Sequence, residues 1–560
     1  MNPRTPDCPE ETVRPVLVYD TTLRDGTQRE GVSLSAVDKI RIARLLDGLG
    51  VAFVELGWPG SNPKDAEAFE RARDVPWESA QIAAFGATRR ANISPEDDPQ
   101  VAALLATKAP ICTIFGKTSF LHVRDVLRVS AEENLQMIAE TVSFLVESGR
   151  RVVYDAEHFF DGYREDAEFA TETVLAAASG GAETIVLCDT NGGTAPWEIE
   201  ERVRALVAKL KAAIGIHAHD DIGCAVASSL AAVRAGATQV QGTVNGYGER
   251  CGNANLCSIL PTLELKMRRR CLRAGALREM THVARQVAEI ANLAPDAHAP
   301  YVGRSAFAHK GGVHVAAIRR NARAYEHVDP RLVGNTTRVV VSELSGRGNV
   351  LSKAEEYDVA LDAKAGTAVL ADVKEREARG FAFEAAEASV ALMMRRQGAA
   401  YEAPFELVDY KVIVGQRERE GAFSDATIKI RVRGQLVHTA AEGNGPVSAL
   451  DAALRKALVA AYPQVTGIRL EDYKVRILDG VAGTSAIVRV LIESGYGEER
   501  WTTVGASPNL IEASWLALAD GIEYGLAVAS AAAAQAAEQK TAAPARAQGG
   551  VSTPAAKGAA

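Results

Sequence analysis

The chain repeats one arrangement of apolar and polar positions between residue 14 and about residue 265. A short apolar run, rich in β-branched residues, is followed by a polar or glycine-rich turn and then by an amphipathic helical stretch. Eight such runs predict eight strands, at Val16–Asp20, Ala52–Gly57, Ile82–Ala87, Ile111–Phe115, Arg151–Ala156, Thr184–Asp189, Gly215–His219 and Gln239–Val244. Eight strand–helix units within about 250 residues are typical of a (β/α)8 TIM barrel. A doubly wound parallel sheet is the competing arrangement, but it usually has fewer strands.

Capping signals mark the helices between these strands. Ser35 stands three residues before Asp38, and Ser130 stands three residues before Glu133, which is the pattern of a capping box. Gly50 follows the first apolar helical run, as a glycine at a helix C-terminus commonly does. The sequence therefore predicts where several of the barrel helices begin and end.

The sequence changes character twice after the predicted barrel. Residues 270–400 are mainly helical in pattern, with an interruption at 301–350 that is rich in glycine, histidine and asparagine. Within residues 405–527 four segments alternate polar and apolar positions, as half-exposed strands do, and two amphipathic helices lie between them. The four predicted strands are 405–415, 425–434, 473–480 and 485–495. This pattern predicts an α+β domain with antiparallel pairing. We therefore expect an N-terminal extension, a TIM-barrel catalytic domain, helical linker subdomains, a C-terminal α+β domain and a disordered alanine-rich tail, over residues 1–13, 14–290, 291–404, 405–527 and 528–560.

Composition narrows the class of protein without identifying it. Of 560 residues, 47% are hydrophobic and 24% charged, and 63 Lys and Arg against 71 Asp and Glu leave a net charge of −8. These values are ordinary for a globular protein. We find no basic run suited to nucleic acid, no apolar run of the roughly 18 residues that a membrane span needs, and no secretory signal. Seven cysteines without a CxxC pair fit reduced thiols, so we expect a cytoplasmic enzyme that binds neither nucleic acid nor membrane.

Polar side chains recur where the predicted strands end. Five of the eight strand ends carry them, at residues 20–26, 155–158, 189–191, 217–221 and 245–253. The active sites of TIM barrels lie at the C-terminal ends of the strands, where these segments would meet. The pattern therefore predicts one polar site at that end of the barrel.

Two histidines in this set are spaced as metal ligands on a strand. His217 and His219 are two residues apart, so both side chains point to the same face. Asp25 and Asn253 would add two oxygen donors, and the combined set suits Zn²⁺, Mn²⁺ or Mg²⁺. A lone HxH pair is more often two half-buried histidines with local hydrogen bonds. The acids and amide at neighbouring strand ends favour the metal site here.

Three further residues near these ends have both a functional and a structural interpretation. Arg24 is suited to hold a carbonyl or enolate oxygen, or to pair with a loop carboxylate. Glu157 is suited to act at the reacting centre, or to pair with Arg24 or Arg250. Thr190 is suited to bind a substrate carboxylate, or to cap the helix that follows its strand. The residues alone leave these alternatives open.

Six motifs are distributed along the chain between residues 20 and 349. They read D-T-T-L-R-D-G at 20–26, H-A-H-D-D at 217–221, N-G-Y-G-E-R-C-G-N-A at 245–254, H-K-G-G-V-H at 309–314, Y-E-H-V-D-P at 325–330 and S-G-R-G-N at 345–349. Together they resemble the α-isopropylmalate synthase, homocitrate synthase and citramalate synthase family, which is related to hydroxymethylglutaryl-CoA lyase. The resemblance extends from residue 14 to about 525, and segments 24–35 and 55–65 are most similar to the citramalate synthase branch.

This resemblance implies a Claisen-type condensation. The methyl group of acetyl-CoA adds to the ketone of a 2-oxo acid, and the thioester is then hydrolysed. In the citramalate synthase branch the acid is pyruvate, and the product (R)-citramalate enters isoleucine biosynthesis. The implied roles are ligands of a divalent metal (Mn, Mg or Zn) for Asp25, His217, His219 and Asn253, oxyanion stabilisation for Arg24, catalysis for Glu157, and substrate binding for Arg24, Thr190 and Asp155.

The resemblance also implies a homodimer with a shared active site. His314, contributed by the partner subunit, is the implied base, with Tyr325 in the same class of role and His309 as a second candidate. Taken without the resemblance, His314 reads as a histidine near a helix start that carries no chemistry.

For residues 405–527 the resemblance implies a regulatory domain that binds an end-product amino acid at a dimer interface. Segments 443–452, 481–486 and 505–514 match its effector-binding parts, and isoleucine is the expected effector. A dimerisation domain without effector binding is the alternative. For the whole chain the alternatives are a 2-isopropylmalate synthase with a wider pocket, a lyase running the reverse cleavage, and an amino-acid sensor with an inactive barrel.

Overall fold

The computed structural model describes residues 15–542, except 400, 418–420, 480–482, 484 and 498. These residues form two compact units. The first contains the described residues up to Phe307 together with Glu326–Thr337, and the second contains Ala308–Tyr325 and the described residues from Arg338 onward. The expected N-terminal extension at residues 1–13 lies outside the described part of the chain.

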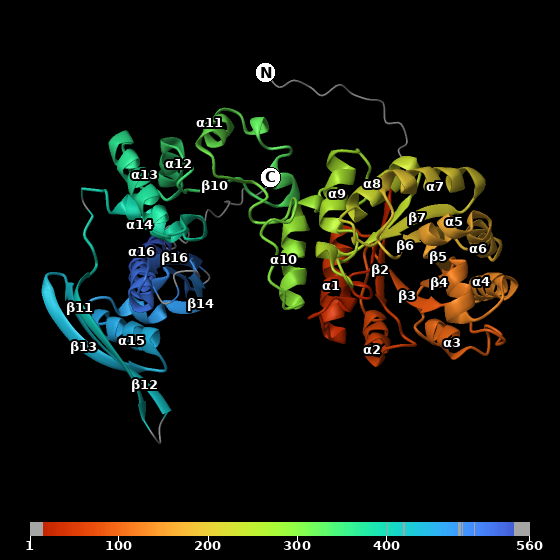
Figure 1. Cartoon of the computed structure of the whole chain (residues 1–560), viewed down its shortest axis with the longest axis horizontal. Coiled ribbons are helices and arrows are strands. Elements are labelled where there is room, and N and C mark those ends of the chain that lie inside the picture. The colour runs from red at the N-terminus through yellow and green to blue at the C-terminus, as the bar shows by residue number, and fades with distance from the viewer. Residues whose placement is uncertain are drawn as a thin grey trace, which may run out of the picture. The chain divides into compact units, whose positions relative to one another are not determined.

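The first unit contains a closed barrel of eight parallel strands in sequential order (Figure 1). Strand β1 pairs with both β2 and β8, which closes the barrel. The strands are β1 Leu17–Asp20, β2 Phe53–Gly57, β3 Gln81–Ala87, β4 Ile111–Lys117, β5 Arg151–Glu157, β6 Thr184–Asp189, β7 Ala213–Ala218 and β8 Gln239–Gly242. The predicted TIM barrel is confirmed, and every predicted strand end lies within two residues of the observed one. The doubly wound alternative is wrong because the sheet closes on itself.

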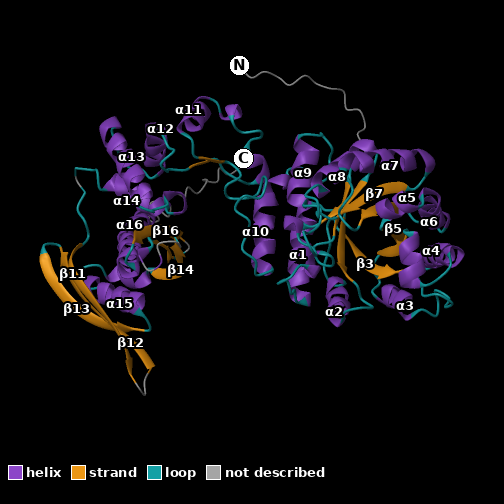
Figure 2. Ribbon diagram, viewed as in Figure 1, coloured by secondary structure: helices purple, strands orange, loops and turns teal. Residues whose placement is uncertain are grey.

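Helices surround this barrel in the alternating order that the sequence predicts (Figure 2). They are α1 Ala36–Leu49, α2 Pro63–Ala72, α3 Pro99–Ala106, α4 Ala131–Glu147, α5 Phe159–Glu165, α6 Ala167–Ser179, α7 Pro196–Lys209, α8 Ala225–Ala235, α9 Leu256–Leu265 and α10 Met280–Ile290, with short turns η1 Gly26–Gln28, η2 His122–Leu127, η3 Val244–Gly246 and η4 Ala276–Glu279. The capping box at α1 is present: Ser35 Oγ accepts from the N–H of Asp38, and the Asp38 carboxylate accepts from the N–H of Ser35. Ser130 likewise accepts from the N–H of Glu133 at α4.

Side chains alternate along the barrel strands between two apolar clusters. One set packs against the helices, as Val18 and Val54 do. The other set fills a separate cluster that includes Tyr19, Phe53 and Val153. Because alternate residues of a strand face opposite sides, the second cluster fills the barrel interior. The polar side chains at the strand ends therefore lie next to a closely packed apolar interior.

The second unit contains a helical part followed by a mixed domain. The helical part consists of α11 Gly312–Arg320, α12 Arg347–Glu356, α13 Ala363–Ala378 and α14 Glu387–Arg395, with β9 Ala308–His309, β10 Arg338–Val339, η5 Ala322–Ala324 and η7 Phe383–Ala385. (Turn η6 Pro330–Val333 belongs to the first unit.) Residues 301–350 are mostly loops and short turns, as the interruption in the sequence predicts.

The mixed domain is built from two successive groups of three antiparallel strands and a helix (Figure 2). The elements are β11 Glu406–Arg417, β12 Gly421–Val432, β13 Gln435–Gly443 and α15 Pro446–Leu458, then η8 Pro463–Gly467, β14 Arg469–Ile477, β15 Val488–Tyr496, β16 Glu499–Ser507 and α16 Leu510–Ala542. The predicted α+β pattern is confirmed, but the sequence pattern indicates only four of the six strands. It misses β13 and β16, since β13 has no buried residue and β16 carries consecutive polar residues at its start.

Helix α16 extends into the segment expected to be disordered. The prediction of disorder is wrong for residues 528–542, and its residues 543–560 lie outside the described part. Alanine is the strongest helix former, so an alanine-rich sequence that follows a packed helix prolongs it. Contrary to the sequence prediction, Leu510–Ala534 is also long and apolar enough for a membrane span by length and composition. Its side chains Ala513, Leu518 and Ile522 are buried in the core of this domain.

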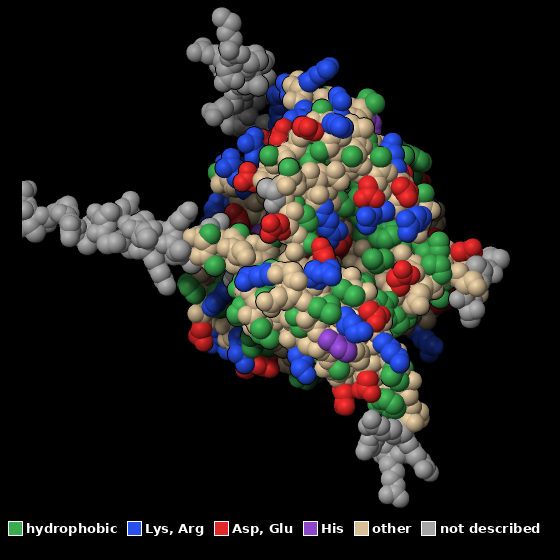
Figure 3. Space-filling model, turned by 90° about the vertical axis from the view of Figure 1, so that its left-hand side faces the viewer, with side chains coloured by type: hydrophobic (Ala, Val, Ile, Leu, Met, Phe, Trp, Pro, Cys, Tyr) green, Lys and Arg blue, Asp and Glu red, His purple; other side chains and the backbone are tan. Residues whose placement is uncertain are grey.

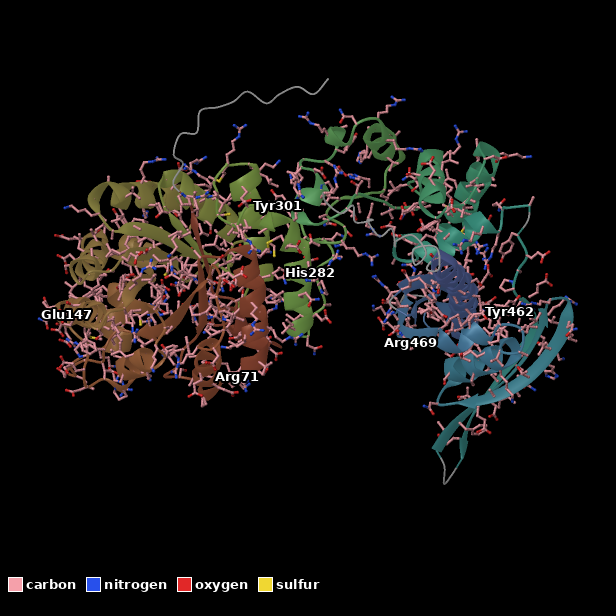
Figure 4. All side chains as sticks on the ribbon, turned by 180° about the vertical axis from the view of Figure 1, so that it is seen from behind. Arg71, Glu147, His282, Tyr301, Tyr462 and Arg469 are labelled. Atoms are coloured by element: carbon pink, nitrogen blue, oxygen red, sulfur yellow. The ribbon has the colours of Figure 1, made fainter. Side chains whose placement is uncertain are left out.

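Charged side chains are distributed evenly on the visible surface. Acidic and basic groups are interspersed on the face drawn in Figure 3. Within the second unit, Arg396 is ion-paired with Asp520 and Glu523, which ties α14 to α16. Figure 4 shows the side chains of both units on the ribbon, with His282 on α10 among those labelled.

Candidate active site

Asp25, His217 and His219 converge at the C-terminal mouth of the barrel. Asp25 follows β1, and the two histidines lie at the end of β7 and just after it. Asp25 Oδ2 is 3.2 Å from His217 Nε2 and 3.9 Å from His219 Nε2, and the two Nε2 atoms are 3.4 Å apart. All three residues are buried. Within the described part of the chain this is a group of ligand atoms that a divalent metal ion would fit.

Asn253 lies beside this group because two backbone segments meet there. Residues His219 and Asn253 form an isolated β-bridge. The Asn253 Nδ2 donates to the carbonyl of Tyr247 at 3.2 Å, whereas its Oδ1 is buried with no hydrogen-bond partner. Gly248 has φ +157°, and a Cβ on it would lie 2.2 Å from Asn253 Nδ2, so only glycine fits there. A buried carbonyl oxygen without a donor is costly, and a cation would satisfy it.

The charges of the cluster suit ligands rather than a simple ion pair. Burial acts to raise the pKa of Asp25, but Arg24 and His217 outweigh burial and hold the pKa of Asp25 well below its usual range. Burial and the neighbouring His217 lower the pKa of His219 to about 3. Burial acts to lower the pKa of His217, but Asp25 raises it overall. At neutral pH the cluster thus offers an ionised carboxylate and a neutral imidazole at His219, the protonation states that metal ligands require.

Gln241 and Asp155 are joined to the His217 ring by a chain of hydrogen bonds. Gln241 Oε1 lies 2.8 Å from His217 Nδ1, and Gln241 Nε2 donates to Asp155 Oδ1 at 3.0 Å. Since the Gln241 oxygen can only accept, His217 carries a proton on Nδ1, and the Nε2 lone pair is left for a metal when His217 is neutral. Burial and the charge of Glu55 raise the pKa of Asp155 to about 7. Asp155 thus both lines the pocket and orients a candidate ligand, and the sequence did not identify Gln241.

Arg24 is held by a carboxylate that the sequence analysis missed. Its Nε donates to Glu55 Oε2 at 2.6 Å, its Nη1 lies 3.4 Å from Asp25 Oδ2, and its guanidinium carbon lies 3.6 Å over the Phe85 ring. Glu55 is fully buried and also accepts from Tyr19 Oη at 2.7 Å. The signal for Glu55 was an acid inside the apolar strand β2. Arg24 is thus ion-paired, as one of its alternatives predicts, with Asp25 in the turn after β1 and with Glu55 on β2, and both carboxylates are buried beside the candidate ligands.

A pocket of about 210 Å³ opens next to these residues. Its lining is Arg24, Asp25, Gln28, Trp58, Phe85, Phe115, Asp155, Glu157, Cys188, Thr190, His217, His219 and Glu249. Glu157 is ion-paired with Lys117, and neither Arg24 nor Arg250 is its partner, since Arg250 pairs with Asp221 and Glu249. Thr190 Oγ1 accepts from the N–H of His158 at 2.8 Å, and His158 directly precedes α5, the helix after β5.

The remaining predicted residues belong to the second unit. His314 lies in the first turn of α11, and its ring stacks on Tyr325 with centroids 4.1 Å apart. His309 lies in β9. Segment 443–452 leads from β13 into α15, and 505–514 leads from β16 into α16, whereas much of 481–486 lies outside the described residues. The roles of these residues stay predictions.

The first unit is a closed (β/α)8 barrel with a buried Asp–His–His group at its C-terminal mouth. Known family models match this barrel and the two regions that follow it. Residues 16–287 match the HMGL-like family, 301–380 the homocitrate synthase post-HMGL domain-like family, and 384–526 the LeuA allosteric (dimerisation) domain.

Relatives that align with this chain over nearly their whole length identify the family within that HMGL-like class. An (R)-citramalate synthase of Geobacter sulfurreducens is 52% identical over 91% of this chain and 97% of its own, and one of Synechocystis is 52% identical over 91% and 96%. A 2-isopropylmalate synthase of Pyrococcus furiosus is 32% identical over 90% and 97%. The chain belongs to the (R)-citramalate synthase family, a group of acyltransferases within the HMGL-like proteins.

Proposed function

We propose that the protein condenses acetyl-CoA with pyruvate and water to give (R)-citramalate and CoA, as a step of isoleucine biosynthesis in the cytoplasm. The observation that carries this proposal is the placement of Arg24 beside the Asp25–His217–His219 group in one pocket. A 2-oxo acid presents a ketone and a carboxylate on adjacent carbons, which suits chelation by a cation with a fixed guanidinium next to it.

The metal is proposed to be Mn²⁺, Mg²⁺ or Zn²⁺, held by Asp25, His217, His219 and Asn253. When bound, it polarises the ketone of the 2-oxo acid. The unsatisfied Asn253 Oδ1 supports the fourth ligand, because no described donor reaches this buried atom. The mixture of nitrogen and oxygen donors does not discriminate among the three ions.

Arg24 is proposed to stabilise the negative charge that develops on the ketone oxygen. Its Nε is engaged by Glu55, and its plane is fixed by stacking on Phe85. The terminal N–H groups are therefore oriented before substrate binds, and preorganised donors act most strongly in a buried site. Thr190 Oγ1 already accepts from a backbone N–H, so its own proton remains to donate to the carboxylate of pyruvate.

Removal of a methyl proton from acetyl-CoA requires a base. We assign this role to His314 of the partner subunit, supported by the stacked Tyr325, with Glu157 acting at the same centre. The functional enzyme is accordingly a homodimer with a shared active site. We assign isoleucine as the effector of the domain at residues 405–527, and the match to the LeuA allosteric (dimerisation) domain supports this assignment.

The experiment measures CoA release from acetyl-CoA and Mn²⁺ with pyruvate or 2-oxoisovalerate, each with and without isoleucine or leucine. We expect a preference for pyruvate and inhibition by isoleucine. A preference for 2-oxoisovalerate with inhibition by leucine would move the protein to the 2-isopropylmalate synthases. Absence of CoA release with both acids would overturn the proposed reaction.

A further inference from the structure

The pocket has a single aromatic wall. Most of its lining residues are charged or polar, whereas Trp58, Phe85 and Phe115 contribute apolar rings from the ends of β2, β3 and β4. Trp58 meets Phe85 edge-on at 5.5 Å and Phe115 at 5.6 Å, and the two phenylalanine rings stack at 5.3 Å. If the oxygens of a 2-oxo acid face the cation site and Arg24, this wall is the large apolar surface left for its alkyl group.

Trp58 differs from its two neighbours because it lies in a turn after β2. The ladder of the sheet therefore does not hold it, and its position depends on local anchors. A β-bulge between Glu55 and Gly57 redirects the chain at this point. Gly57 has φ +159°, and a Cβ there would lie 2.4 Å from Asp65 Oδ2. The turn is thus shaped around the carboxylate of Asp65.

Asp65 links this turn to a buried lysine outside the pocket. Its Oδ2 accepts from the N–H of Trp58 at 2.8 Å, and its Oδ1 is 2.5 Å from Lys39 Nζ. Lys39 also donates to the carbonyl of Leu56 at 3.0 Å. Lys39 is 3% exposed and Asp65 5% exposed. Apart from the contact between them, the hydrogen bonds of these two side chains described above go to Leu56 and Trp58.

Stability alone does not account for such a pair. The desolvation of two buried charges offsets much of their attraction, and apolar replacements are often as stable. A buried pair can instead specify one local geometry, and here that geometry is the position of the indole. The indole N–H itself donates to Gln100 Oε1 at 3.1 Å, which adds a second anchor on the far side of the ring.

We propose that the Lys39–Asp65 pair positions Trp58 in the pocket wall and that the indole thereby limits the size of the 2-oxo acid side chain. Lys39 and Asp65 are positioning residues, and Trp58 is the specificity-determining residue. This inference rests on the proposed condensation and deepens it, since it names the part of the pocket that selects a methyl group.

The first test compares Trp58→Leu with the matched control Trp77→Leu. Trp77 is a half-buried tryptophan that donates to the carbonyl of Ala72 and does not line the pocket. The measurement is kcat/KM for pyruvate, 2-oxobutyrate and 2-oxoisovalerate. We expect the preference for pyruvate over 2-oxobutyrate to fall about ten-fold in Trp58→Leu, the scale of one methylene in an apolar pocket, and to be unchanged in Trp77→Leu. An unchanged ratio in Trp58→Leu overturns the inference.

The second test separates positioning from stability. The double variant Lys39→Met/Asp65→Asn removes both charges but keeps an acceptor for the N–H of Trp58, whereas Lys39→Met/Asp65→Ala removes the acceptor as well. Neither leaves an unpaired buried charge. We expect the alanine pair to lose selectivity as Trp58→Leu does. The asparagine pair keeps the acceptor for the N–H of Trp58 but loses the contacts of Lys39, so we expect it to lose part of the selectivity, with thermal unfolding confirming that both fold. Wild-type selectivity in both pairs overturns the positioning role.

The same measurements distinguish failure of the proposed function from failure of this inference. If wild-type protein releases CoA with none of the three acids, the condensation is wrong, and the inference falls with it. If wild-type protein prefers pyruvate but the variants keep that preference, the condensation stands and only the inference is wrong.

Discussion

The barrel mouth and the C-terminal domain bury side chains for opposite reasons. At the mouth, Asp25, His217 and Glu55 are all buried and held in polar contacts. In the C-terminal domain, alternate residues of β12 such as Ile428 and Ile430 are buried in an apolar core. Burial of charge costs free energy, while burial of apolar surface provides it.

This difference separates function from stability in one chain. Burying the polar cluster at the mouth of the barrel lowers the free energy of unfolding, and the apolar barrel interior and the surrounding helices offset this loss. The C-terminal domain has two groups of three strands and a helix that share one apolar core. Substitutions at the mouth should therefore change chemistry more than stability, and substitutions in the C-terminal core should do the reverse.

Loss of a candidate metal ligand gives the largest expected effect. We expect His219→Ala to lower kcat/KM at least about 1,000-fold, or about 4 kcal/mol, because the cation that polarises the ketone is lost. The bound metal content and steady-state kinetics check this. His282→Ala is the matched control, since His282 is exposed on α10 (Figure 4). Full activity of His219→Ala would remove the metal assignment.

Replacement of Arg24 comes next. Arg24→Lys keeps the positive charge but cannot both bind Glu55 and present a planar fork to the oxygen. We expect kcat to fall about 100- to 1,000-fold with a smaller change in KM, since the lost contact strengthens as charge develops. Arg29→Lys, an exposed neighbour outside the pocket, should behave as wild type. A change confined to KM would contradict the oxyanion role.

A shortened side chain in the core of the C-terminal domain tests whether that region contributes to stability rather than to chemistry. Leu450 is fully buried in α15, and Leu450→Ala should reduce the free energy of unfolding of this region by about 2–5 kcal/mol. Metal binding should not change. Calorimetry and a metal titration measure the two effects, with Leu510→Ala, a largely exposed leucine, as control. Weakened metal binding in Leu450→Ala would contradict the assignment of function to the barrel mouth and of stability to the C-terminal core.

The smallest effect concerns the support of His217. Gln241→Leu removes the acceptor for the His217 Nδ1–H and the donor to Asp155. We expect metal affinity to fall about 10- to 100-fold while the fold persists. Titration with Mn²⁺ measures it. Gln81→Leu, at the start of β3 and thus at the opposite end of the barrel, should bind metal as wild type does, and equal affinities in both variants would sink the proposed support.

The barrel was predictable because its signals are local. Each strand is a short apolar run between capped helices, and closure follows from the number of strand–helix units. His217 and His219 were predictable as neighbours because they share a strand face. Strand β13 was not predictable, since none of its residues is buried and period-2 apolar alternation is the signal that sequence provides.

The site contacts that were missed join distant segments. Glu55 is 31 residues from Arg24, and Gln241 is 86 residues from Asp155. Their residue types carry no signal of such pairing, because a buried glutamate or glutamine is recognised only by the group that it meets. The pairing of Glu157 with Lys117 rather than an arginine has the same origin.

The alternation of elements, the helix caps and the set of residues able to bind a metal could be predicted from the chain alone, because periodicity and residue chemistry are properties of neighbours in the sequence. The three-dimensional fold was needed to establish which acid holds Arg24, which amide orients His217 and how Trp58 enters the pocket wall. Those outcomes depend on strands and turns that meet when the sheet closes, where burial makes each polar contact either satisfied or costly.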